Sequence, residues 1–132
     1  MRYAPIADID RTSVARLRVA WRWSTVERNI VAAPDQKSAR PGLFQASPLV
    51  VGDTLFVSTP YAAVAALDAR TGREFWKYDP EVWRAGQPSN GTGFVHRGVA
   101  TWADRGERRV FINARWKLVA IDAYECERIA GI

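Results

Sequence analysis

The side chains that could carry chemistry in this sequence are few and well separated. His96 is the only histidine, and a lone histidine with no identified partner is more often an ordinary polar contact than a base. Asp68 and Asp122 could act as acids, but both stand at turn positions, where a carboxylate usually closes the turn. Cys126, the single cysteine, forms no internal disulfide and has no second thiol with which to bind a metal. We therefore predict no catalytic residue and no metal ligand in this chain.

Arg97 and Gln45 have side chains better suited to binding than to catalysis. A guanidinium group can hold paired oxygens or a carboxylate through two hydrogen bonds. A glutamine amide both donates and accepts hydrogen bonds but contributes no negative charge. Each residue also has an ordinary interpretation, because Arg97 could pair with a nearby carboxylate on a loop and Gln45 could be a polar residue at the start of a strand.

Short antiparallel strands are predicted to position these two residues. Between Ala46 and Tyr78, β-rich runs recur about every ten residues, as in an antiparallel meander. Gly52-Asp53 can form a tight hairpin, and Gly72 can take the left-handed position of a bulged turn. The four predicted strands cover residues 47–51, 55–59, 64–68 and 74–78.

The opening segment is predicted to form a short helix and then a strand. Asp10 can cap a helix over residues 11–18. Residues 19–25 alternate as in a strand with one buried face. The three residues on the predicted buried side are Val19, Trp21 and Trp23. Residues 27–42 are polar and contain two prolines, so an irregular excursion is expected there.

A second β-rich stretch begins at Gly98 and repeats the first. Ala66-Leu67-Asp68-Ala69 recurs as Ala120-Ile121-Asp122-Ala123, 54 positions later. Strands are predicted over residues 99–102, 110–114 and 118–122. Repeats of this length indicate propeller blades, each of which needs neighbours to cover its sheet faces. The predicted fold class is therefore all-β, a partial β-propeller of about two four-stranded antiparallel blades, which do not close a ring.

One segment of the first repeat, Ala66-x-Asp68-x-x-Thr71-Gly72-x-x-x-Trp76, is the most informative. Asp68 can accept hydrogen bonds from Thr71 and close the turn. Trp76 then leaves the turn on the outermost strand, where its ring can pack against an adjacent blade while its N–H binds a backbone carbonyl. The small side chain of Ala66 lets neighbouring sheets approach closely.

This segment resembles the tryptophan-docking repeat of the quinoprotein alcohol and glucose dehydrogenases, which depend on pyrroloquinoline quinone (PQQ) and have an eight-bladed propeller. Other stretches resemble the same family in the same order. They are Arg2-Tyr3-Ala4-Pro5-Ile6, Gln45-Ala46-Ser47-Pro48-Leu49, Val57-Ser58-Thr59-Pro60, Tyr78-Asp79-Pro80 and His96-Arg97-Gly98-Val99-Ala100. The resemblance implies an N-terminal propeller fragment, with residues 1–25 as an opening helix and strand, 43–80 as the first blade, and 98–130 as a second, degenerate blade.

The resemblance also implies a function for the family to which the fragment would belong. Arg97 corresponds to an arginine that contacts the quinone, and Gln45 stands where many relatives carry a glutamate that hydrogen-bonds it. The family oxidises a small-molecule alcohol or sugar by hydride transfer to PQQ, while a calcium ion polarises a quinone carbonyl and an aspartate takes the substrate proton. The calcium ligands and that aspartate are expected outside this chain, so the isolated chain is expected to be inactive.

The sequence departs from the family pattern in its second repeat. Glu125, Cys126 and Ala130 replace Thr71, Gly72 and Trp76, so the turn glycine and the tryptophan are both lost. A cysteine pair found in some branches is absent from residues 91–95, which favours branches without it, including the glucose-dehydrogenase-like members. The alternative is a non-enzymatic propeller of the same repeat type, used as a binding or assembly scaffold, which would have no reason to keep Arg97 and Gln45.

Composition excludes other classes of function. The formal net charge is +5, but the arginines are scattered rather than clustered, so no nucleic-acid surface is predicted. No apolar stretch approaches the roughly 20 residues of a membrane-spanning helix. The family is periplasmic, whereas no signal peptide is recognised in this chain. Because a sheet face is left open where the next blade should dock, the isolated chain is expected to self-associate or to be readily proteolysed.

Overall fold

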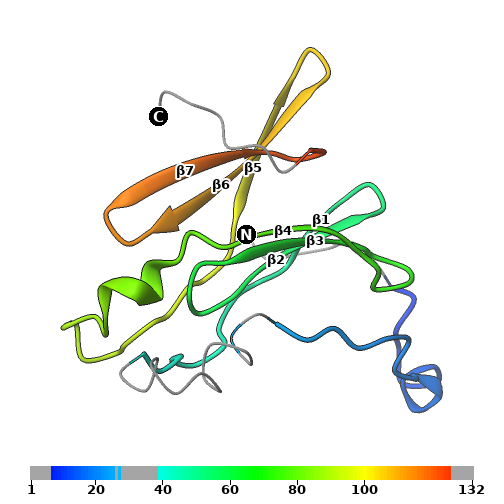
Figure 1. Ribbon diagram of the computed structural model, residues 1–132. Coiled ribbons are helices and arrows are strands. Elements are labelled where there is room, and N and C mark those ends of the chain that lie inside the picture. Colours follow the sequence, from blue (N-terminus) through cyan, green and yellow to red (C-terminus); the bar gives the residue numbers. More distant parts are fainter. Residues whose placement is uncertain (1–6, 26, 28–38, 126–132) are drawn as a thin grey trace.

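The computed structural model describes residues 7–25, 27 and 39–125, and folds them into two antiparallel sheets (Figure 1). The first sheet contains four strands in chain order, β1 (Leu49–Val51), β2 (Thr54–Ser58), β3 (Val64–Asp68) and β4 (Glu74–Tyr78). The second contains β5 (Ala100–Asp104), β6 (Glu107–Ala114) and β7 (Lys117–Asp122). The predicted all-β, partial-propeller fold is confirmed, and the short 3-10 helix η3 (Val82–Ala85) lies between the sheets in the chain.

The turns of the first sheet have the predicted chemistry. Gly52 adopts a φ of 58° in the two-residue loop between Val51 and Thr54. Gly72 adopts a φ of 72°, a left-handed conformation that glycine reaches without steric cost. The expected bulge is also present, because the register between β3 and β4 shifts between Ala66 and Leu67.

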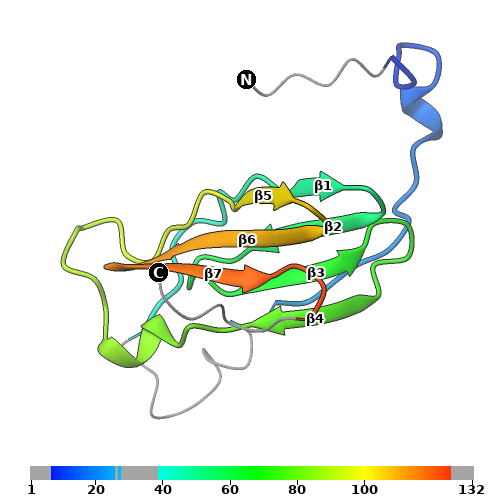
Figure 2. The same cartoon turned by 90° about the horizontal axis from the view of Figure 1, so that it is seen from above.

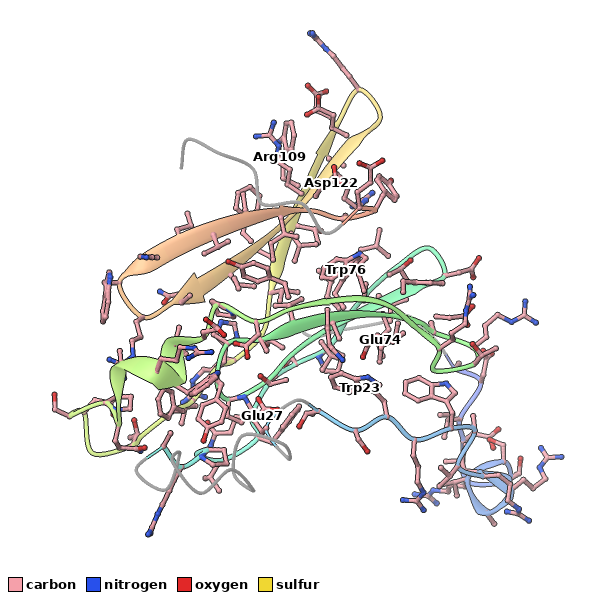
Figure 3. The ribbon with its side chains drawn as sticks, viewed as in Figure 1. Trp23, Glu27, Glu74, Trp76, Arg109 and Asp122 are labelled. Carbon is pink, nitrogen blue, oxygen red and sulfur yellow. The ribbon has the colours of Figure 1, made fainter. Side chains whose placement is uncertain are left out.

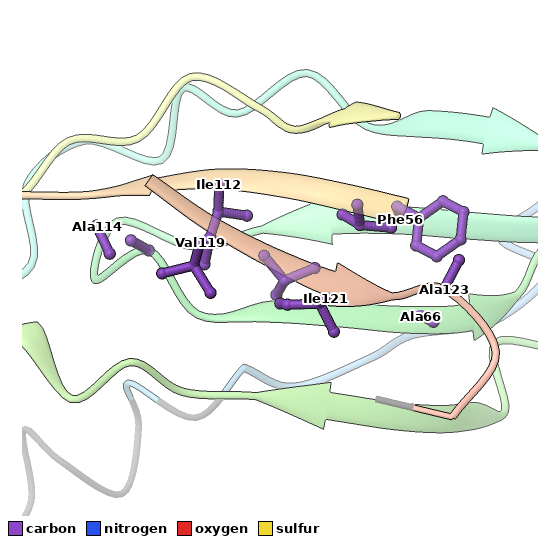
Figure 4. Packing of buried hydrophobic residues seen from close by; sticks show 10 residues of the cluster. Phe56, Ala66, Ile112, Ala114, Val119, Ile121 and Ala123 are labelled. Carbon is purple, nitrogen blue, oxygen red and sulfur yellow. The ribbon is translucent and has the colours of Figure 1, made fainter. Parts of the chain in front are cut away.

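The two sheets stack face to face, and the core lies between them (Figures 2 and 4). Alternate side chains of each strand point to the same face, so one apolar face of each sheet is available for this contact. Burying these faces removes apolar surface from water and is the main source of stability for the pair of blades. The core includes Phe56, Val64, Ala66, Val110, Ile112, Val119 and Ile121.

Trp76 joins the two sheets as the sequence predicts. Its indole N–H donates a hydrogen bond of 2.9 Å to the carbonyl oxygen of Ala123, which follows β7. Its ring lies 6.0 Å from the ring of Phe56 and packs between the sheets (Figure 3). Ala66, opposite Trp76 in the ladder, is fully buried, so its small side chain leaves room for the indole.

Trp21 makes the same kind of contact with the first sheet. Its indole N–H donates a hydrogen bond of 3.2 Å to the carbonyl oxygen of Ala69, the residue equivalent to Ala123 in the repeat. Trp21 lies 48 positions before Ala69 in the sequence, and Trp76 lies 47 positions before Ala123. The ring also lies against Gly72, where a Cβ atom would approach the indole to 2.5 Å. The opening segment therefore packs on the first sheet through Trp21, in the same way that the first sheet packs on the second through Trp76.

The predicted helix over residues 11–18 is wrong in its length and type. The structure has only a single 3-10 turn, η1 (Val14–Arg16). Asp10 is not its cap, because the N-cap of η1 is Ser13; the Asp10 carboxylate instead closes the preceding turn by accepting hydrogen bonds from the backbone N–H groups of Thr12 and Ser13. No residue of the turn is buried, and a short helix without tertiary packing is marginal.

The predicted strand over residues 19–25 is also wrong. Within the described part of the chain this segment pairs with no strand, and Val19 is 68% exposed instead of sharing a buried side with the tryptophans. Trp21 and Trp23 do pack against the apolar face formed by Val57 and its neighbours. The alternation over residues 19–25 therefore corresponds to two tryptophans that pack on the first sheet, and not to a strand hydrogen-bonded to a neighbour.

The second sheet shows three strands among the described residues, not the four expected of a full blade. The 54-residue repeat aligns β4 with residues 128–132, which lie outside the described residues, as do Cys126 and Ala130. Most of the predicted excursion over residues 27–42 also lies outside them. Glu27 and the residues from 39 onward are described, and the side chain of Glu27 is buried beside the backbone N–H of Tyr61.

Candidate functional site

Two segments that lead into the two sheets run side by side. Parallel bridges pair Pro41 with Phe94 and Ser47 with Gly98. The Gly42 N–H donates to the carbonyl of Phe94 at 2.8 Å, and the Ser47 N–H donates to the carbonyl of Arg97 at 2.9 Å. Because the bridges lie on both sides of Gln45 and Arg97, they bring these two residues together although they are far apart in the sequence.

Gln45 and Arg97 line one pocket of about 440 Å³. The other lining residues are Leu43, Asn90, Thr92 and Val95. Among the described residues that form its wall, the polar groups are neutral or cationic and none is a carboxylate. An oxygen-rich or anionic ligand would find hydrogen-bond donors and one positive charge in this pocket.

The Arg97 guanidinium is available for a ligand. Both Arg97 and Gln45 are exposed. Within the described residues, neither side chain takes part in a hydrogen bond or ion pair, and only the backbone carbonyl of Arg97 is engaged. The ordinary interpretation of Arg97 requires a nearby carboxylate that pairs with it. No described carboxylate does so.

A second pocket of about 510 Å³ adjoins the first and shares Asn90, Val95 and Arg97 with it. Arg115 adds a second cation to its wall. The Arg115 guanidinium donates to the carbonyl of Gly86 and lies 5.4 Å from the centre of the Phe94 ring. The continuous wall formed by the two pockets is therefore more positive than Arg97 alone would make it.

His96 also lines this second pocket, and it is held by neighbours that the sequence did not reveal. Its Nδ1 lies 2.8 Å from the hydroxyl oxygen of Ser58, which is fully buried on β2. Burial lowers the pKa of His96, and a backbone hydrogen bond with Asn113 partly opposes this shift. Ser58 could not be anticipated as a partner, because it is 38 residues away and lies inside a predicted strand.

Asp68 and Asp122 are turn-forming residues, as predicted. The Asp68 carboxylate accepts hydrogen bonds from the backbone N–H groups of Arg70 and Thr71 at 2.9 and 2.8 Å. The N–H and hydroxyl of Thr71 are the main reasons why the pKa of Asp68 is lowered. Asp122 accepts from Tyr124 and Glu125 in the same way, so the second repeat keeps this turn although it lacks the threonine.

Neither a metal centre nor a membrane span is found in the part of the chain that the structure describes. No three or more His, Cys, Asp or Glu side chains gather there in a group that could hold a metal ion. No helix there has the length and apolar character needed to cross a membrane.

Two blade-like sheets, joined by the contact of Trp76 with Ala123 and bearing a pocket where their leading segments meet, define part of a β-propeller. The profile of the family described as "PQQ: Glucose/ethanol/alcohol dehydrogenase, beta-propeller domain" matches residues 1–131. The chain belongs to this family.

Several similar proteins of known sequence are alcohol dehydrogenases. The 1-butanol dehydrogenase (cytochrome c) of Thauera butanivorans is 34% identical over 97% of this chain and 16% of its own length. Quinohemoprotein alcohol dehydrogenase ADH-IIG of Pseudomonas putida is 32% identical over 96% of this chain and 16% of its own length. The chain therefore spans only 16% of the length of these relatives.

Solved structures agree with the fold. The quinohemoprotein alcohol dehydrogenase of Comamonas testosteroni superposes with a TM-score of 0.71 at 31% identity, over 97% of this chain and 17% of that one. A europium-containing methanol dehydrogenase superposes with a TM-score of 0.66 at 26% identity, over 96% of this chain and 20% of that one.

Proposed function

We propose that this chain supplies the first two blades of a longer PQQ-dependent dehydrogenase that oxidises a small alcohol or sugar. Membership of the family supports the class of reaction. The observation that carries the proposal is the meeting of Gln45 and Arg97 in one pocket that no described carboxylate lines. A scaffold propeller without a cofactor has no need to place both side chains there.

The pocket suits the chemistry of PQQ, which carries three carboxylates and two quinone oxygens. Arg97 would hold a carboxylate or a pair of oxygens through the two N–H groups of one guanidinium edge. Gln45 would orient the cofactor by donating one hydrogen bond and accepting another, without adding charge. Bound PQQ supplies the acceptor for the hydride of the substrate.

The remaining parts of the active site would come from later blades. The calcium ligands and the general base are proposed to lie there, which leaves this chain to bind and orient one edge of the cofactor. Since the pocket opens to solvent, other blades must also complete its walls and exclude water. The isolated chain is accordingly proposed to be inactive, and the complete protein to act in the periplasm.

Arginine variants of the complete polypeptide that carries this chain test the proposal. Replacing Arg97→Ala should weaken PQQ binding by roughly 10- to 100-fold, because a charge-assisted hydrogen-bond pair is lost. Arg70→Ala is the matched control, since it removes the same charge from an exposed turn away from the pocket. Calorimetric titration of the apoprotein with PQQ, followed by a dye-linked assay with alcohols and glucose, gives both readouts.

Saturable PQQ binding that Arg97→Ala weakens and Arg70→Ala leaves intact would support the proposal. No PQQ binding by the wild-type apoprotein would favour the scaffold alternative. Binding with equal affinity in both variants would remove Arg97 from the site.

A further inference from the structure

His96 connects three segments of the chain at the boundary between the two sheets. Its Nδ1 lies 2.8 Å from the hydroxyl oxygen of Ser58 on β2 and 3.4 Å from the backbone nitrogen of Gly98. Its ring also has a backbone hydrogen bond with Asn113 near the end of β6. One imidazole thus contacts the first sheet, the second sheet and the segment that leads into the second sheet.

These contacts favour one tautomer of the ring. The Gly98 N–H can only donate and lies 3.4 Å from Nδ1, so it suits a ring in which Nδ1 carries no proton. In this tautomer the Ser58 hydroxyl, at the shorter distance of 2.8 Å, is the main donor to Nδ1, and the ring proton is on Nε2. A protonated ring would have donors on both nitrogens and would lose the Gly98 contact.

The position of Arg97 depends directly on this arrangement. Arg97 lies between His96 and Gly98 in the chain, and both neighbours meet at the same Nδ1. Its own carbonyl accepts the hydrogen bond from Ser47 of the segment that carries Gln45. The backbone around Arg97 is therefore attached to the first blade on two sides.

We propose that His96 is a positioning residue, which fixes the backbone of Arg97 through Ser58 and Gly98 and so presents the guanidinium to the pocket shared with Gln45. The expected effect of His96 on PQQ binding rests on the proposed function. The contacts of His96 with Ser58 and Gly98 do not depend on any cofactor.

The surroundings of the ring favour the neutral form that this role needs. Ser58 is fully buried, so its hydrogen bond to His96 is protected from competing water. The charged residues that line the pocket around His96 are the cations Arg97 and Arg115, and burial of the ring lowers its pKa. No described acidic residue lines that pocket to stabilise an imidazolium.

Two substitutions of His96 separate positioning from simple packing. In His96→Asn the amide oxygen stands near the place of Nδ1 and can still accept from Ser58 and Gly98. In His96→Gln the amide lies one bond further out, so the acceptor at the Nδ1 position is lost. A third variant, Ser58→Ala, removes only the hydroxyl that donates to the ring.

Nuclear magnetic resonance can follow the contact directly in the 132-residue chain, because His96 is its only histidine. Trp102→Lys and Leu118→Lys are added to the outer face of the second sheet in every sample to limit self-association. Imidazole ¹⁵N shifts should show a neutral ring protonated on Nε2, and Ser58→Ala should change the Nδ1 shift. Backbone ¹⁵N relaxation at Arg97 should show increased mobility in His96→Gln and in Ser58→Ala, but wild-type order in His96→Asn. A melting curve of each variant shows whether the fold is kept.

Cofactor binding by the complete polypeptide provides the second readout. His96→Gln should raise the Kd for PQQ about three- to tenfold, as expected for one lost hydrogen bond, whereas His96→Asn should stay within about twofold of wild type. A ring protonated on Nδ1, or an Arg97 backbone equally ordered in all variants, would overturn the inference. If wild type fails to bind PQQ, the proposed function fails, and the relaxation data still decide whether His96 positions Arg97.

Discussion

The polar residues of the site are arranged around one arginine. In the proposed site, Arg97 supplies a charge to the pocket, Gln45 supplies neutral hydrogen bonds, and His96 fixes the backbone of Arg97. None of these residues has a carboxylate partner among the described residues, which suits an anionic ligand. At this scale the proposed role of the chain is to bind the cofactor.

Stability should depend on pH through His96. The pKa of His96 in the folded chain lies below its ordinary value of 6.5, so the unfolded chain binds a proton more readily as the pH falls. The stability that the neutral ring provides is therefore present above about pH 6.5 and decreases below it. Urea unfolding at about pH 7.5 and pH 5.5 should show a loss at the lower pH.

His96→Asn is the control for this pH dependence, because asparagine does not titrate. Lowered carboxylate pKa values, such as that of Asp68, act only in the more acidic range below their ordinary 3.8. Equal loss of stability in wild type and in His96→Asn over the same interval would show that another group is responsible.

The resemblance to the quinoprotein family singled out Gln45 and Arg97 in the sequence, and the structure brings both side chains to one pocket, but the rest of their surroundings could not be predicted. The partners Ser58 and Asn113 lie on strands where side-chain alternation predicts only which face a residue occupies. A contact across 38 residues follows from the stacking of the two sheets, which the sequence pattern does not specify.

At the scale of the elements, two equivalent tryptophan contacts join successive layers. Trp21 binds the carbonyl of Ala69, and Trp76 binds the carbonyl of Ala123. The 54-residue repeat revealed the equivalence of the two acceptors, because it aligns the strands that precede them. It did not reveal Trp21 as a counterpart of Trp76, since the opening segment lacks the turn that precedes Trp76. The strand predicted over residues 19–25 is absent because no described strand pairs with that segment.

The contact of Trp76 with Ala123 can be measured by removing the indole N–H. Trp76→Phe should lower the free energy of unfolding by about 1–2 kcal/mol, because a hydrogen bond to a partly buried carbonyl is lost together with some packing. Trp116→Phe is the control, since Trp116 is 74% exposed in a hairpin turn. Chemical denaturation of both variants gives the comparison, and an equal change in the two would contradict the joining role of Trp76.

The close approach of Trp21 to the first sheet can be tested at two glycines with a positive φ, 58° at Gly52 and 72° at Gly72. Gly72→Ala places a methyl group 2.5 Å from the Trp21 ring, whereas Gly52→Ala meets no atom within 4 Å. Both substitutions incur the cost of positive φ, about 1–2 kcal/mol. Gly72→Ala should be the more destabilising by at least a further ~1 kcal/mol. Similar melting temperatures for the two variants would show that Trp21 does not pack there.

At the scale of the whole molecule, the second sheet has one covered and one open face. The open face carries Trp102 and Leu118, which are 45% and 54% exposed. Arg109 stacks on Trp102 and points away from the first sheet, as does Asp122 (Figure 3). An apolar sheet face left in water marks a docking surface or a site of aggregation. In the proposed propeller, the next blade would cover it.

The isolated chain should therefore self-associate. Sedimentation velocity over micromolar concentrations should show a weight-average mass that rises with concentration. The double variant Trp102→Lys and Leu118→Lys should remain closer to 14.8 kDa, because the charges must be desolvated on association. A wild-type chain that stays monomeric and melts cooperatively at these concentrations would contradict the open-face account.

A structure of the complete polypeptide with bound PQQ would test the central claim most directly. The account predicts that oxygens of the cofactor lie within about 3 Å of the Arg97 guanidinium and of the Gln45 amide, in the pocket where the leading segments of the two blades meet. A cofactor bound elsewhere in the ring, with both side chains in contact only with solvent, would contradict it.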